Sequence, residues 1–154
     1  PNHLIAQTPD HVIILHEMFR DRRIIPITDR PHASVRQWNG DIRGRWDGDT
    51  LVVESLHFAD KTSDRWAATW RMPTKTMHLV ERFTRLDLDT LEYEFTLTDP
   101  AKFTQPWSVR VPLTTNQSSR GVTEGPLYEY ACHEGNYSLS NVLSGARTEE
   151  RNAK

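Results

Sequence analysis

Two neighbouring segments, HLVERFTRLD at His78–Asp87 and TLEYEFTLT at Thr90–Thr98, decide the fold class of this chain. The apolar positions that alternate with polar ones in the second segment are Leu91, Tyr93, Phe95 and Leu97. This period of two is typical of a strand with one buried face. Leu88 and Asp89 join the two segments, so the pair is predicted to form an antiparallel hairpin.

Similar patterns recur along the whole chain. They predict further strands at about His3–Gln7, His11–Phe19, Arg22–Ile27, Arg43–Trp46, Thr50–Phe58, Trp107–Leu113 and Leu127–Cys132. Asp47-Gly48-Asp49 is the clearest connection, because a two-residue hairpin turn needs the positive φ that Gly accepts. A meander of about eight to nine strands can hide its edges by closing on itself. The sequence therefore predicts an all-β, antiparallel, lipocalin-like barrel.

The pattern changes to a helical spacing after Asn136. The apolar residues with this spacing are Tyr137, Leu139, Val142, Leu143 and Ala146. We expect a C-terminal helix at about residues 137–150 that packs against the barrel wall or caps one mouth.

Length and charge narrow the function classes. A chain of 154 residues suits a single domain over 1–154. The net charge of −2, with no stripe of Lys and Arg, argues against a nucleic-acid partner. No stretch approaches the roughly 20 apolar residues of a membrane span. The single Cys132 cannot form an internal disulfide.

Four strings carry a resemblance to a known family. They are GRWDGDTLVVES at Gly44–Ser55, LVERFTRLDLDTLEYEFTLTDP at Leu79–Pro100, PWSVRVPL at Pro106–Leu113 and LYEYACHEGNYSLSNVLSGARTEE at Leu127–Glu150. The chain resembles a family of uncharacterised, generally exported bacterial proteins with no established activity. The resemblance implies a periplasmic or secreted domain. The chain departs from it at Lys61–Lys75, where a His-containing loop would be expected.

The strand that begins near residue 76 carries ionisable residues on both faces. One face has His78 and Arg82, and the other has Glu81. A buried charge must be paired or must bind something, so all three are candidate catalytic or ligand-orienting residues. The alternative is a cross-strand ion pair with Glu92 or Glu94.

A second reactive segment runs from the last predicted strand into the helix. There His133, beside Glu134, is a candidate general acid or base, and Tyr130 is a candidate ligand contact. The alternative is that Asn136 caps the helix and His133 only hydrogen-bonds a loop.

The long connection Thr28–Ile42 contains a third group of polar residues. Pro31 stiffens this connection and presents Arg30 and His32 from a defined position, where they could bind a carboxylate or pair with Asp41 or Asp49 to hold the flap. No sequence-local metal motif is present, yet His32, His78 and His133 could converge on one divalent metal.

These residues support three functional hypotheses. In the first, the barrel interior binds a small molecule, with an aromatic lining of Trp46, Tyr93, Phe95 and Trp107. In the second, a cofactor-free or single-metal enzyme (isomerase, lyase or hydrolase) works at the barrel mouth with His, Glu and Arg side chains. In the third, Trp66 and Trp70 form a protein-interaction surface, which could also make a homo-oligomer.

Overall fold

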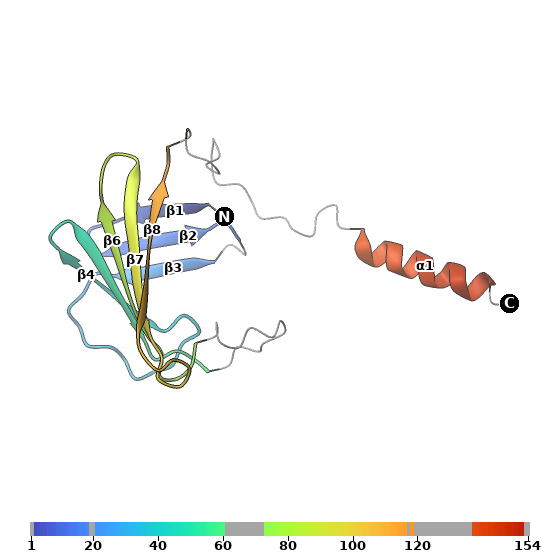
Figure 1. Ribbon diagram of the computed structural model, residues 1–154, viewed down its shortest axis with the longest axis horizontal. Helices are drawn as coiled ribbons and strands as arrows, with labels where there is room; N and C mark the ends of the chain where they lie inside the picture. The colour runs from blue at the N-terminus through green and yellow to red at the C-terminus, as the bar shows by residue number, and fades with distance from the viewer. Residues whose placement is uncertain (1, 19–20, 61–72, 117, 119–136, 153–154) are drawn as a thin grey trace.

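The chain forms two antiparallel sheets followed by one helix. The computed structural model describes residues 2–18, 21–60, 73–116, 118 and 137–152. Sheet A contains β1 (His3–Gln7), β2 (His11–His16) and β3 (Arg22–Pro26), in that order. Sheet B contains, also in sequence order, β4 (Asp41–Asp47), β5 (Thr50–Leu56), β6 (His78–Arg85), β7 (Thr90–Thr98) and β8 (Trp107–Thr114). Figure 1 shows the sheets packed together and α1 (Ser138–Asn152) standing apart from them.

The predicted class, antiparallel β with a C-terminal helix, is confirmed, whereas a closed barrel is not detected in the described part of the chain. The sheets are connected by an isolated bridge between Ile27 and Gly44. Because this bridge is parallel, it does not continue the antiparallel ladder from β3 into β4. The expected ninth strand at Leu127–Cys132 lies outside the described residues. No helix of the described part is long and apolar enough to cross a membrane.

The hairpin turns follow the predicted chemistry. Asp47 and Thr50 form the last pair of the β4–β5 hairpin, and Gly48 between them has a φ of 58°. This left-handed conformation is the reason for glycine at the turn. The β6–β7 connection is longer than the two residues expected, because β6 ends at Arg85 and β7 starts at Thr90.

The core lies between the inner faces of the two sheets. Its buried apolar residues are Val12, Ile14, Ile25, Ile42, Leu51, Val53 and Phe83. Gly44 lies in close contact with sheet A and the residues that follow it, since a Cβ there would lie 2.8 Å from side-chain atoms of both Ile25 and Ile27. Any larger residue at this position would push the sheets apart.

The register of β6 shows which of its two mixed faces is buried. Glu81 and Phe83 point into the core. His78 and Arg82 lie on the outer face, together with Val80 and Thr84. Arg82 is opposite Glu94 in the ladder but forms its ion pair with Asp47, at 2.9 Å.

One buried ion pair connects the two sheets. Arg23 of β3 donates two hydrogen bonds to Glu81 of β6, and Glu81 is only 1% exposed. Tyr93 of β7 donates its hydroxyl to the same carboxylate at 2.8 Å. Burial, together with the charge of Glu81 and the hydrogen bond to it, raises the pKa of Tyr93 far above its ordinary value. Burial lowers the pKa of Arg23, but its hydrogen bond to Glu81 and that carboxylate's charge more than compensate, so the net direction is upward.

We predict that Arg23→Met destabilises the protein by about 3–5 kcal/mol, because it leaves a buried carboxylate without its cation. The double variant Arg23→Met/Glu81→Leu should recover most of this loss, since no charge stays buried. Urea unfolding measures both values. The control is Arg110→Met, which removes the exposed partner of Glu94 and should cost no more than about 1 kcal/mol. A cost for Arg23→Met as small as that of the control would contradict the prediction.

Candidate functional site

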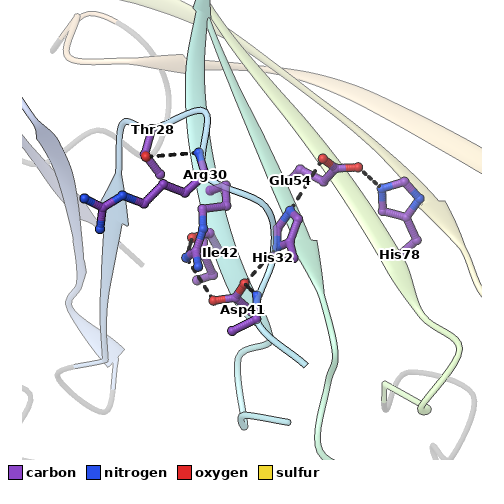
Figure 2. A network of polar contacts seen from close by, with 9 residues as sticks. Thr28, Arg30, His32, Asp41, Ile42, Glu54 and His78 are labelled. Atoms are coloured by element: carbon purple, nitrogen blue, oxygen red, sulfur yellow. Dashed lines mark hydrogen bonds and ion pairs between the residues drawn. The ribbon is translucent and has the colours of Figure 1, made fainter. Parts of the chain in front are cut away.

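Two hydrogen-bonded pairs, each of one histidine and one carboxylate, lie next to each other on the outer face of sheet B and are together called the outer network. His32 comes from the connection between β3 and β4, and Asp41 is the first residue of β4. Glu54 lies on β5, and His78 is the first residue of β6. Figure 2 shows the network running from Asp41 through His32 and Glu54 to His78.

Asp41 fixes the buried end of this network. Asp41 Oδ1 forms an ion pair with Arg43 Nη1 at 2.9 Å. Asp41 Oδ2 accepts hydrogen bonds from His32 Nδ1 and from the Ala33 amide, each also at 2.9 Å. Three donors around one buried carboxylate fix its position. Because a carboxylate only accepts, the Nδ1 of His32 must carry the hydrogen.

Glu54 lies between the two imidazoles. His78 Nε2 is 2.7 Å from Glu54 Oε1, which is a short hydrogen bond. His32 Nε2 is 3.5 Å from Glu54 Oε2, too far for a good hydrogen bond, and this nitrogen is buried without any partner. The side chains of His78 and Glu54 are 37% and 34% exposed, so the network opens to solvent at this end.

A strained residue lies beside the network. His57 is the one non-glycine residue of the described part with positive φ, at 57°. Its ring centroid is 6.5 Å from that of His32. Backbone strain of this kind costs on the order of 1–3 kcal/mol and is concentrated at functional sites. Thus three of the seven histidines are gathered at one end of sheet B.

The structure brings together only some of the predicted site residues. His32 and His78 meet through Glu54, and the expected pairing of His32 with Asp41 is confirmed. Arg30 contacts Thr28 through its backbone amide, and Figure 2 shows its side chain pointing away from His32. Arg82 is paired with Asp47 near the β4–β5 turn, and Glu81 belongs to the core. His133 and Tyr130 lie outside the described residues, as do Trp66 and Trp70.

Sequence reasoning missed Glu54. Its signal was weak, because it is a single charged residue within the mostly apolar strand TLVVESL. Neighbouring residues of a strand nevertheless point to opposite faces. Because Val53 is a core residue, Glu54 must lie on the outer face.

The predicted aromatic lining lies on the inner face of sheet B and forms a row of packed rings. Tyr93 stacks on Phe83 at 4.8 Å, Phe95 is 5.7 Å from Tyr93, and Trp107 is 5.5 Å from Phe95. Trp107 Nε1 is buried and has no hydrogen-bond partner among the described residues.

Two open cavities lie at opposite ends of sheet B. The larger, about 660 Å³, is bordered by Gln7, Trp46, Gly48, Asp49, Arg85, Leu86, Asp87 and Leu88. The smaller, about 360 Å³, is bordered by Arg36, Trp38, Ala59, Asp60 and Lys75, at the end that carries the histidine network. Of the predicted aromatic residues that the structure describes, only Trp46 borders either cavity.

The metal hypothesis receives no support from the described residues, among which no group of three or more His, Cys, Asp or Glu side chains is placed to hold a metal ion. His133, the third candidate ligand, lies outside them. Comparisons with protein-family models, with curated proteins and with solved structures find no match. The function is therefore argued from the site alone.

We predict that the two histidines hold opposite tautomers. At a pH above the ordinary titration range of histidine, His32 should be protonated on Nδ1 by its bond to Asp41, and His78 on Nε2 by its bond to Glu54. Imidazole ¹⁵N chemical shifts distinguish protonated from bare nitrogens. Glu54→Gln should remove the preference of His78, while Arg82→Gln should change neither ring. A bare Nε2 on His78 in the parent protein would contradict the network.

Proposed function

We propose that this protein is a cofactor-free enzyme that transfers protons to and from a small polar substrate, with His78 as the general acid or base. The observation that carries this proposal is the 2.7 Å bond between His78 Nε2 and Glu54 Oε1. A carboxylate that holds one ring nitrogen as a donor leaves the other as a bare base. The same carboxylate stabilises the imidazolium that forms when His78 takes up a proton.

The geometry supports His78 rather than His32 as the residue that meets substrate. Nδ1 of His78 makes no hydrogen bond with the described residues, and its side chain is more than a third exposed. His32 is enclosed behind Glu54, since its Nε2 is buried. We assign Glu54 the positioning role, because its carboxylate holds the ring of His78, whereas His32, with its hydrogen on Nδ1, offers no donor to Glu54 at Nε2.

The smaller cavity lies at the same end of sheet B as His78, which is not among its lining residues, and the charges of that lining favour a small anionic substrate. Arg36 and Lys75 supply two cations against one acidic residue, Asp60. Trp38, 62% exposed, provides a flat apolar surface beside them. The cavity of about 360 Å³ lies within the size range of small-molecule sites, roughly 300–1,000 Å³. A carbonyl compound with a carboxylate group fits this combination.

The test is proton exchange at carbon. Small 2-oxo acids and 3-hydroxy acids would be incubated with the full chain in D₂O, and loss of the signal of the C–H next to the carbonyl group (C3–H of a 2-oxo acid, C2–H of a 3-hydroxy acid) followed by NMR. We expect exchange above the buffer rate with at least one compound, and a fall of about 10²–10⁴-fold in His78→Gln.

Arg82→Gln is the matched control, because Arg82 lies four residues along the same outer face of β6 and is bonded to Asp47. This variant should retain the parent rate within twofold. Equal unfolding midpoints for both variants would show that the loss is not one of folding. An undiminished rate in His78→Gln would overturn the assignment.

A second candidate function is small-molecule binding at the larger cavity, in keeping with a binding barrel. The observation that favours it is Trp46, which points from the inner face of β4 into this cavity and is 45% exposed. Arg85 borders the same space and contributes a cation. Asp49 and Asp87 border it too, so the two carboxylates outnumber the one guanidinium, and an aromatic cation fits this lining better than an anion does. In this proposal the antiparallel sheets act as an incompletely closed, lipocalin-like barrel whose mouth holds the ligand.

We predict that thioflavin T, an aromatic cation, binds at this mouth. Trp46→Ala should weaken binding at least tenfold in a fluorescence titration, because the stacking surface is lost. Trp38→Ala is the control, since Trp38 borders the other cavity. Equal weakening by both substitutions would argue against a site at Trp46.

An exported location, periplasmic or secreted, is also a proposal, and its support is the family resemblance of the sequence strings. Self-association is a further proposal, which light scattering at several concentrations would test.

A further inference from the structure

The outer face of sheet A is aliphatic. Leu4 lies opposite Leu15, Ala6 opposite Ile13, and Ile13 opposite Ile24 in the ladders of β1, β2 and β3. These residues alternate with the core residues Val12, Ile14 and Ile25, so they share the face that points away from sheet B. Leu4 and Ile24 are each 53% exposed.

Sheet B provides an internal comparison. Its outer face carries charged and polar side chains, including those of Arg43, Glu54, Arg82, Glu94 and Arg110. An antiparallel sheet with one face in water normally shows this polar pattern. A contiguous aliphatic face on the neighbouring sheet is therefore a surface that another apolar element covers.

Helix α1 has a matching apolar stripe. Leu139, Val142, Leu143 and Ala146 follow the i, i+3, i+4, i+7 spacing of one helix face. None of the helix is buried, and the first three of these side chains are 72%, 67% and 48% exposed. A helix of 15 residues is only marginally stable in water by itself, so α1 needs a packing partner.

We propose that α1 packs across the outer face of sheet A of the same chain. At about 1.5 Å per residue the helix is long enough to cross three strands spaced about 4.8 Å apart. The chain between Thr114 and Ser138 can extend by about 3.3–3.6 Å per residue, which allows α1 to reach either sheet.

Charge complements the apolar match. Glu150 follows Leu139 by three helical turns and so lies at the end of the same stripe. Arg22 lies opposite Leu15 at the rim of the aliphatic face and is exposed. The packing buries both apolar surfaces, as in other layers of helix on sheet.

The test is hydrogen exchange of the α1 amides in the full chain, compared with an isolated peptide of residues 137–152. Docking should slow their exchange about a hundredfold relative to the peptide. Leu143→Lys on the helix and Ile24→Lys on the sheet should each restore exchange to within about threefold of the peptide. Ser144→Lys is the control, because Ser144 is 100° from Leu143 on the polar side, and it should leave the protection within twofold.

Two results would overturn the proposal. One is exchange in the full chain equal to that of the peptide. The other is protection that grows with protein concentration while light scattering shows a doubled mass, which would make a second copy the source of the helix. Protection lost in Leu143→Lys but kept in Ile24→Lys would also overturn it, because α1 would then pack elsewhere.

Discussion

The ion pair between Arg23 and Glu81 is the interaction on which the rest of the structure depends. It crosses the interior from sheet A to sheet B and places a charge of each sign in a core made otherwise of aliphatic and aromatic side chains. Removing two charges from water is costly, and their attraction offsets that cost only while both remain in place with their hydrogen bonds. Tyr93 supplies one of those bonds, and its raised pKa keeps the hydroxyl protonated as a donor. The pair therefore fixes which residues of β3 and β6 face inward.

The position of the outer network follows from this constraint. With Glu81 inward, alternation places His78 on the outer face of β6. Val53, the ladder partner of Glu81, is in the core, and so Glu54 points outward on β5. A slip of one residue would move His78 into the core and Glu81 into solvent, separating both pairs at once. The network thus relies on a register set by a contact on the opposite side of the sheet.

The sequence predicted what depends on local pattern and failed where distant segments must meet. Alternation identified the β6–β7 hairpin, and Gly48 identified a turn, because both signals are contained in a few consecutive residues. His32 and His78 were recognised as candidates, but Glu54, which joins them, was hidden within an apolar strand. Closure of the barrel was predicted from strand number alone, whereas closure depends on pairing between strands far apart in the chain. The apolar stripe of the helix predicted that the helix packs against another apolar surface, but the stripe alone does not identify that surface.

The two ionic clusters differ in the property that proton transfer requires. Glu81 is enclosed, and it accepts hydrogen bonds from both of its partners, Arg23 and Tyr93, so this cluster is a structural one. The outer network has a closed end at Asp41, satisfied by three donors, and an open end at His78. The donors around Asp41 keep that end in one geometry, and the end at His78 is open to solvent. Both are needed for an imidazole to act repeatedly as acid and base, and in the described part of this chain the outer network combines them.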